Sequence, residues 1–374
     1  MRKNDLYIGI LVFLCFFNFW ILSCIQTQAN DHEFVLHEIG HIPTAGRTDC
    51  VHTVENTLYI LDFNLGFLTY DVSNPANSTL LGSYEGSNSI NPSVKGGHSF
   101  FVRGDYAIVG FQHAGLQIID VSDPANLEVV GIYYGGTDTY NLAVADDLVY
   151  LVMEYDGLQI IDISDVTQPI KVGEFINGNP LYHIGVCGNY VFTKDAEQEK
   201  TLWLNVTNPS NITEIGQFDW VAVDLEMVGD IDYIGAFSEG VLIYDFSDPN
   251  NPLSLSQHND GGTACDIDII GDLAFVADGI DGLEILNITD SVNPVEVAQF
   301  KDGEFSVNVF VKDNVAYIAE RENGVVILEL WKEDVVNQVS AFNQYLVLIG
   351  LFVVLVIRKR KKWILRETLN PRLD

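Results

Sequence analysis

The stretch Gly115-Leu116-Gln117-Ile118-Ile119-Asp120-Val121-Ser122-Asp123-Pro124 is a short apolar strand that a glycine opens and an Asp/Pro turn closes. Similar stretches begin at six other positions, which are Gly66, Gly157, Lys200, Gly240, Gly282 and Gly324. Successive starts lie 40 to 49 residues apart. A period of ~40–45 residues with several short strands in each unit is typical of a β-propeller, with one unit in each blade.

Each unit contains four predicted strands. In one complete unit, apolar runs at 266–270, 273–277, 283–288 and 295–300 are separated by Gly, Asp, Asn and Pro turns, the pattern of an all-β fold. The last unit ends at 325–331 without a fourth strand, and residues 34–42 align with the fourth strands of other units. We therefore expect an all-β, seven-bladed β-propeller of ~42-residue repeats. The N-terminal strand would close its last blade and leave no open sheet edge.

These repeats resemble the LVIVD-repeat family of bacterial and archaeal surface propellers, named for a phrase like GLQIIDVSDP at 115–124 and GLQIIDISD at 157–165. The resemblance covers residues 34–331. It implies the propeller fold and a position at the cell surface, but no uniform biochemical activity. The copy at Lys200 departs most from the phrase, because lysine replaces the glycine, and we expect a distorted loop in the fourth blade.

The chain is strongly acidic. Its 374 residues include 52 Asp and Glu against 19 Lys and Arg, which gives a formal net charge of −33. Such a surface repels nucleic acid, so we expect no nucleic-acid partner. It favours cations, basic partners or a salty medium, although solubility alone explains the charge equally well.

Both ends of the chain carry membrane-targeting patterns. Residues 1–29 combine Arg2 and Lys3 with a long apolar run and small residues at the end, which predicts a cleaved signal peptide, or else a signal anchor. A second apolar span at 339–357 is followed at once by a basic run, as in a stop-transfer segment. The predicted layout is a signal peptide at 1–29, a propeller at 30–332, a linker at 333–338, a transmembrane helix at 339–357 and a cytoplasmic tail at 358–374. The propeller would lie outside the cell on a single-pass anchor.

The segment His37-Glu38-Ile39-Gly40-His41 matches the H-E-x-x-H pattern of zinc proteases. That chemistry needs two histidines one helical turn apart, at ~2.0–2.1 Å from one zinc ion. This segment aligns with strands instead, where residues four apart are separated by about 13 Å. Gly40 also occupies a position that Gly131, Gly173 and Gly216 fill in other fourth strands. We interpret the match as a coincidence in a strand and predict no catalytic residue.

One polar residue recurs at the same position in the first strand of every blade, and first strands surround the channel of a propeller. This polar column consists of Cys50, Ser99, Asn141, His183, Asp224, Asp266 and Asn308. Glu226 and Asp268 follow two residues later, on the same side of their strands. Asp224, Glu226, Asp266 and Asp268 thus come from adjacent blades and could bind Ca²⁺, the one cofactor that we consider. We favour the alternative, a hydrated channel whose polar groups bind water and one another.

The loops that lead into the first strands carry aromatic residues, including Tyr140, Tyr182 and Trp220. Exposed aromatic rings among polar groups are typical of contact surfaces for proteins. With Ser99, Asn141, His183 and Asn308, they form the predicted ligand face. Of four Asn-x-Ser/Thr sequons, Asn205 and Asn287 occupy a turn-capping position held by Asp elsewhere, which leaves Asn77 and Asn211 as predicted glycan sites.

Together these features predict a membrane-anchored extracellular module that binds a protein, glycan or cell-envelope partner without catalysis. One alternative is an extracellular hydrolase or lyase with a divalent cation at the channel mouth. In that case His183 is the one column residue suited to proton transfer near neutral pH. Another alternative is a purely architectural surface protein. The sequence does not determine the oligomeric state.

Overall fold

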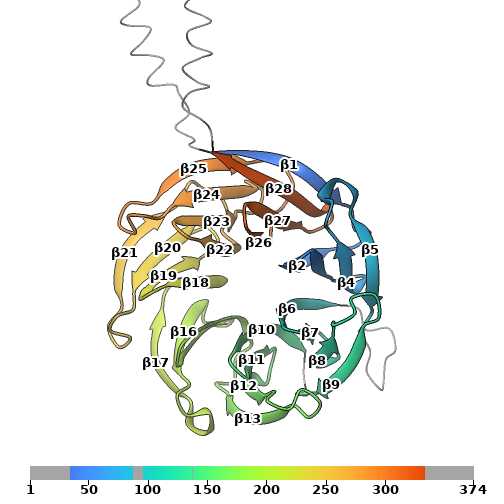
Figure 1. The fold of residues 1–374 in the computed structure, drawn as a ribbon. Coiled ribbons are helices and arrows are strands. Elements are labelled where there is room, and N and C mark those ends of the chain that lie inside the picture. Colours follow the sequence, from blue (N-terminus) through green and yellow to red (C-terminus); the bar gives the residue numbers. More distant parts are fainter. Residues whose placement is uncertain (1–33, 87–95, 137, 333–374) are drawn as a thin grey trace, which may run out of the picture. The chain divides into compact units, whose positions relative to one another are not determined.

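The computed structural model describes residues 34–86, 96–136 and 138–332. Within them, seven four-stranded sheets surround a central axis, one sheet for each repeat (Figure 1). This confirms the predicted seven-bladed all-β propeller. The predicted signal peptide, linker, transmembrane helix and tail lie outside the described residues. In the described part of the chain, no helix has the length and apolar character needed to cross a membrane.

We number the blades from the first complete repeat, and strands run in chain order within blades 1 to 6. Blade 1 contains β2 (Thr48–Val54), β3 (Thr57–Asp62), β4 (Gly66–Asp71), η1 (Pro75–Asn77) and β5 (Thr79–Tyr84). Blade 2 contains β6 (Gly97–Arg103), β7 (Tyr106–Phe111), β8 (Gly115–Asp120) and β9 (Glu128–Tyr133). Blade 3 contains β10 (Thr139–Ala145), β11 (Leu148–Met153), β12 (Gly157–Asp162) and β13 (Ile170–Phe175).

The remaining blades continue in the same way. Blade 4 contains β14 (Leu181–Cys187), β15 (Tyr190–Asp195), β16 (Lys200–Asn205), η2 (Pro209–Asn211) and β17 (Thr213–Phe218). Blade 5 contains β18 (Asp224–Val228), β19 (Ile231–Gly235), β20 (Val241–Asp245) and β21 (Leu253–His258). Blade 6 contains β22 (Asp266–Ile270), β23 (Leu273–Ala277), β24 (Leu283–Asn287) and β25 (Val295–Phe300). Blade 7 contains β26 (Asn308–Lys312), β27 (Val315–Glu320), β28 (Gly324–Lys332) and β1 (Phe34–Ile42).

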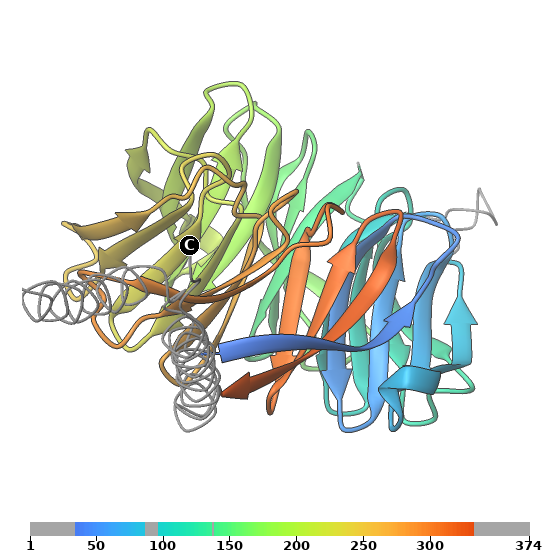
Figure 2. The ribbon, with the colours of Figure 1, turned by 90° about the horizontal axis from the view of Figure 1, so that it is seen from above.

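Blade 7 closes the ring, because β1 lies beside β28 as its fourth strand. The ring nitrogen Nε2 of His41 donates to the carbonyl oxygen of Asn323 at 2.7 Å, which joins residues 282 positions apart. The predicted closure by the N-terminal strand is therefore confirmed. β1 begins and β28 ends close together, on the face opposite the turn that joins Glu320 to Gly324 (Figure 2).

β1 also resolves the H-E-x-x-H match, since His37 to His41 lie in an extended strand, as predicted. Gly40 faces the turn after β4, where an added Cβ would lie 2.2 Å from the carbonyl oxygen of Pro75. The glycine is thus needed for packing between blades 7 and 1. The segment matches a zinc-protease motif in sequence only.

The backbone requires the repeated glycine at the start of the third strand in six of the seven blades. At six of the seven copies its φ lies between 70° and 92°, a range that side chains disfavour. A Cβ on any of these glycines would also lie within 2.5 Å of a fourth-strand carbonyl oxygen. At the seventh copy the preceding Glu199 takes the left-handed conformation instead, with φ 52°, which allows Lys200 in the strand. The predicted distortion in blade 4 is therefore a one-residue shift of the turn.

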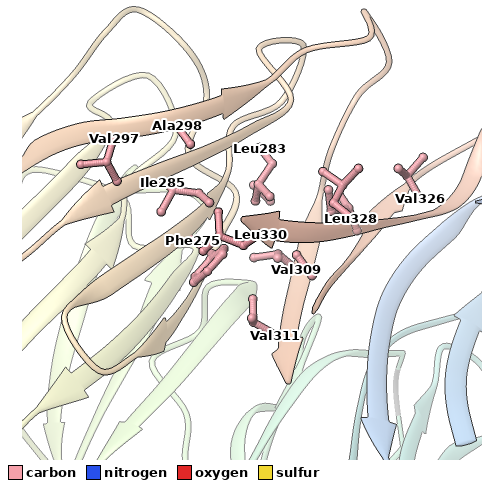
Figure 3. Packing of buried hydrophobic residues seen from close by; sticks show 13 residues of the cluster. Phe275, Leu283, Ile285, Val297, Ala298, Val309, Val311, Val326, Leu328 and Leu330 are labelled. Carbon is pink, nitrogen blue, oxygen red and sulfur yellow. The ribbon is translucent and has the colours of Figure 1, made fainter. Parts of the chain in front are cut away.

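The hydrophobic core lies between neighbouring blades. Figure 3 shows Phe275 and Ile285 of blade 6 packed against Val309 and Leu328 of blade 7, in one cluster of buried residues. Other clusters join the remaining blades in the same manner. Because each buried side chain of this size contributes about 1.5–3 kcal/mol, these contacts hold the first strands in a fixed ring.

In blades 1 to 6, the polar residue that ends the third strand caps the following turn. Asp120 Oδ1 accepts the backbone N–H of Ser122 at 2.9 Å. Asn205 and Asn287 accept equivalent bonds from Thr207 and Thr289 at 3.0 Å, which confirms their predicted capping role. Asn77 and Asn211 are exposed at the ends of η1 and η2, and their glycosylation stays a prediction.

Candidate functional site

The channel holds a cavity of ≈ 580 Å³ to which all seven blades contribute. Every residue of the predicted polar column lines it: Cys50, Ser99, Asn141, His183, Asp224, Asp266 and Asn308. Tyr140, Tyr182 and Glu226 line it as well. In addition to Cys50, the structure therefore brings nine of the predicted site residues together around the cavity.

Two predicted residues lie elsewhere. Asp268 is not among the cavity-lining residues, and its Oδ2 accepts the backbone N–H of Val311 in the next blade. Trp220 belongs to the aromatic cluster between blades 4 and 5. Its ring centroid is 4.5 Å from that of Phe218, and its Nε1 donates to the Tyr244 hydroxyl at 3.1 Å. Trp220 is thus a packing residue that happens to belong to a loop.

The first strands of blades 1 to 4 form what we call the bulged half of the channel. In each of these blades the first strand begins to pair with the second strand before the column residue, and the register shifts by one residue next to the column. Such a bulge leaves a residue out of the ladder and redirects its side chain. The residues left out of the ladder are Asp49, His98 and Tyr140, and in blade 4 both Tyr182 and the column residue His183; all five line the cavity.

The bulge residues form a continuous ladder across these four blades. Asp49 Oδ2 accepts a hydrogen bond from Arg47 Nη2 at 2.6 Å and lies 3.4 Å from His98 Nδ1. The His98 ring stacks on Tyr140 with 5.4 Å between centroids and 9° between planes. Tyr140 in turn contacts Tyr182 at 4.3 Å. Offset aromatic contacts of this kind contribute about 0.5–1.5 kcal/mol each and hold the rings in place.

Blades 5 to 7 form the latched half of the channel. Here the first strand starts at the column residue, and its side-chain oxygen accepts a backbone N–H from the next blade. Asp224 accepts from Ile267 at 3.1 Å, Asp266 from Val309 at 2.8 Å, and Asn308 from Val51 at 2.8 Å. Asp266 also accepts from Asn308 Nδ2 at 2.8 Å. These side chains are thus occupied in joining one blade to the next.

The carboxyls of the latched half are crowded and hard to ionise. Burial, and then the charge of Asp224, raise the pKa of Asp266 well above its usual range. Burial also raises the pKa of Asp224 and of Asp268. For Glu226, burial and then Asp224 and Asp268 raise the pKa to about 7. The cavity wall therefore holds protons or attracts cations near neutral pH.

These four carboxyls do not form a compact ligand set. In the described part of the chain, no three of them bring their oxygens within 4.8 Å of one another. Asp224, Asp266 and Asp268 already accept backbone N–H groups. This pattern fits the hydrogen-bonded channel that we favoured, and calcium binding at this place stays a prediction.

His183 lies in the last blade of the bulged half and is neutral near pH 7. Burial, followed by the charges of Lys194 and His98, lowers its pKa to about 4. Its ring makes an edge contact with Phe237, 5.6 Å between centroids. A neutral imidazole in this position can accept or donate one hydrogen bond to a ligand.

The sequence reasoning missed several residues at the mouth, chiefly Arg47, Asp49, Phe237 and Arg321. Arg47 lies over the ring of Phe63 and Arg321 over that of Phe305, at 4.5 and 4.4 Å from the centroids. Both arginines come from loops outside the aligned column. A search for cationic residues just before first strands would have found Arg47.

Comparison with known families identifies the repeat. The LVIVD repeat matches residues 45–86, 98–134, 136–176, 261–302 and 306–330, which correspond to blades 1, 2, 3 and 6 and to the greater part of blade 7. Blades 4 and 5 have the same four strands without a match of their own. No curated protein matches the chain in sequence.

Several solved structures share the fold. The Cps50 (Swd1) β-propeller domain of Myceliophteria thermophila is 11% identical, with a TM-score of 0.62 over 79% of this chain and 99% of that one. The Pan2 WD40 domain of Neurospora crassa is 8% identical, with a TM-score of 0.59 over 79% and 95%. The computationally designed protein Ika8 is 10% identical, with a TM-score of 0.55 over 78% and 99%. At these identities the likeness shows the fold alone.

Proposed function

We propose, from the premise that this chain belongs to the LVIVD-repeat family, that it is a non-enzymatic, membrane-anchored extracellular module that binds a partner at the channel mouth. Propellers of this kind commonly serve as binding scaffolds. The observation that carries the proposal is the ladder Asp49–His98–Tyr140–Tyr182, which lines the cavity across four blades. Fixed aromatic rings beside polar groups are the usual anchors of a binding surface.

The chemistry of the mouth favours a protein partner that inserts a basic side chain. One wall offers the tyrosine rings and the other offers carboxyls of the latched half. A Lys or Arg side chain can lie against an aromatic ring while its charge faces carboxylates. The net charge of −33 attracts such a partner over a longer range. A glycan that stacks on the same rings is the alternative ligand.

Site-specific photo-cross-linking in cells that produce the full-length chain tests this proposal. A photoreactive amino acid at Tyr182 should give a defined adduct, and the same group at Ile132, exposed on the rim strand β9, should not. Mass spectrometry of the adduct then separates a peptide from a sugar. A sugar adduct would replace the protein partner by a glycan. Equal labelling at both positions, or none at Tyr182, would contradict a binding role for the mouth.

The extracellular position is supported by the sequence at 1–29 and 339–357, and it requires its own test. Protease added to intact cells should digest the propeller and leave a C-terminal tag protected. Protection of the propeller in intact cells would contradict the proposed orientation.

The hydrolase or lyase alternative has less support from the geometry. Asp224 and Asp266 serve as acceptors between blades, and the compact metal-ligand set that a hydrolytic cation requires does not form among the channel carboxyls. Turnover of a candidate substrate that is lost in Asp266→Asn, with folding retained, would favour catalysis over binding.

A further inference from the structure

Three positions of the propeller repeat meet on the mouth side of a blade, away from the channel. They are the loop residue six positions before the column residue, the residue 12 positions after the column residue, at or just after the end of the second strand, and the third-strand residue two after the repeated glycine. In blade 3, Gln159 at the third position donates to the carbonyl oxygen of Gly135 at the first, 3.3 Å away. In blade 4, Asn177 at the first position donates to Asp195 at the second, at 2.8 Å. The three positions therefore form a recurring polar contact.

Blade 4 shows how a buried acid is stabilised at this place. Asp195 is fully buried, and its Oδ2 accepts amide N–H groups from Asn177, Asn179 and Gln198 at 2.8 to 3.2 Å. Its Oδ1 accepts the backbone N–H groups of Glu197 and Gln198. Each oxygen of this carboxylate thus has donors supplied by the protein.

Blade 6 places acids at all three positions, which are Asp260, Asp278 and Glu284. One carboxylate oxygen from each lies within 4.8 Å of the other two, and this is the single such group in the described part of the chain. Asp278 and Glu284 are each only 2% exposed, whereas Asp260 is exposed. Where blade 4 has the amide donor Asn177, blade 6 has a further acceptor.

The donors available to this cluster do not satisfy it. Glu284 Oε1 pairs with His258 Nε2 at 2.6 Å, and Asp260 Oδ1 accepts the backbone N–H of Gly262 at 2.9 Å. Asp278 Oδ2 is buried and has no hydrogen-bond partner. A buried, unpartnered carboxylate oxygen costs several kcal/mol unless a proton or a cation meets it.

We propose that Asp260, Asp278 and Glu284 bind one Ca²⁺ ion at the mouth side of blade 6. Ca²⁺ takes carboxylate and carbonyl oxygens at 2.3–2.6 Å, so oxygens up to about 5 Å apart can share one ion. In blade 4 the amide groups of Asn177 and its neighbours donate hydrogen bonds to the buried carboxylate. In blade 6 the positive charge of the ion takes the place of these donors. The exposed Asp260 gives the ion a path to solvent. This site is separate from the channel carboxyls and goes beyond the proposed binding role.

The alternative is a shared proton between Asp260 and Asp278. Burial, with Asp260 and Glu284 nearby, raises the pKa of Asp278 to about 7, so a proton competes with a cation for this carboxyl near neutral pH. The two explanations differ in whether added Ca²⁺ changes the protein.

Calorimetric titration with Ca²⁺ and thermal unfolding of the full-length chain, stripped of metal with a chelator, test the proposal. We expect one Ca²⁺ per chain and a higher Tm in its presence, since an ion that binds only the folded state stabilises it. Glu284→Gln should weaken the affinity at least tenfold. Asp62→Asn, at the matched position in blade 1 where no second acid follows, should leave the calcium response unchanged.

Asp260→Asn keeps the test decisive if the buried variants fail to fold. It introduces the amide found in blade 4, so its Tm in chelator should equal or exceed that of the natural chain, and its calcium response should disappear. No heat and no Tm shift in the natural chain would overturn the proposal in favour of the shared proton. A response that survives in Asp260→Asn and Glu284→Gln but is lost in Asp266→Asn would also overturn it, because it places the ion in the channel.

Discussion

The bulged and latched halves of the channel show one repeat put to two uses. In blades 1 to 4 the bulge directs Asp49, His98, Tyr140 and Tyr182 into the cavity. In blades 5 to 7 the oxygens of Asp224, Asp266 and Asn308 bond the next blade. The column position is the same in both halves. We therefore expect substitutions in the latched half to affect stability and those in the bulged half to affect binding.

The largest effect is expected for Asp266→Ala in the latched half. It removes the acceptor for both Val309 N–H and Asn308 Nδ2 and leaves these groups unpaired in a buried place. We expect a loss of about 2–4 kcal/mol in the free energy of unfolding, measured by denaturant titration. Asp266→Asn, which keeps an acceptor oxygen, should lose clearly less. Equal losses in the two variants would show that the hydrogen bonds do not hold the blades together.

The bulged half should respond less in stability and more in binding. Tyr140→Ala removes ring contacts with both His98 and Tyr182, and we expect a loss of about 1–2 kcal/mol in the free energy of unfolding. The Tyr182 cross-link adduct should disappear in the same variant. Tyr140→Phe keeps the ring and should retain most of both properties. A Tyr140→Ala protein with an unchanged adduct would separate the ladder from binding.

The charge of Asp224 gives a prediction in pH. Burial raises its pKa, so the folded chain holds a proton that the unfolded chain has lost, and stability falls as pH rises from about 4 through the raised pKa. Asp224→Asn removes this slope and keeps an acceptor for Ile267 N–H, as Asn308 does for Val51. Relative to the natural chain, the variant should gain about 2 kcal/mol between pH 4.5 and pH 8. If the prediction is wrong, unfolding curves of the natural chain and of Asp224→Asn, both measured in chelator, would show the same dependence of stability on pH.

The smallest effect is expected for Ser99→Ala. The Ser99 hydroxyl donates to the carbonyl oxygen of Leu142 at 3.2 Å, which is a long neutral hydrogen bond. Its loss should cost about 0.5 kcal/mol or less. A Tm change as large as that of Asp266→Ala would mean that the bulged half is latched as strongly as the other.

The sequence was sufficient for those features that depend on spacing. The repeated glycine located every third strand, the incomplete last unit indicated closure by 34–42, and the aligned first strands located the polar column. These predictions succeed because each repeat folds as the same unit, so equal positions in the sequence become equal positions around the axis.

The division into halves could not be predicted in this way. Asn141 of blade 3 lies 12 residues before Met153, and Asp224 of blade 5 lies 12 residues before Ala236. The spacing is the same, yet a bulge interrupts the strand pairing in blade 3 and not in blade 5. Pairing between strands, rather than spacing along the chain, determines that difference. Trp220 was misplaced for a similar reason, since its burial depends on Phe218 and Tyr244 from neighbouring strands. Asp260, Asp278 and Glu284 come from three segments whose meeting requires the folded blade.

The closure of blade 7 by β1 has a consequence for how the chain acquires its structure. Blades 1 to 6 are each built from one continuous segment, so the strands of each can pair and pack on the preceding blade as soon as its own residues have been synthesised. Blade 7 must wait, because β1 is among the first residues described and β28 is among the last. Until β28 arrives, β1 has an unpaired edge that can pair with another chain. The slow and vulnerable step of folding is therefore the final joining of the two ends, and a chain cut short before residue 324 should form blades but never a ring.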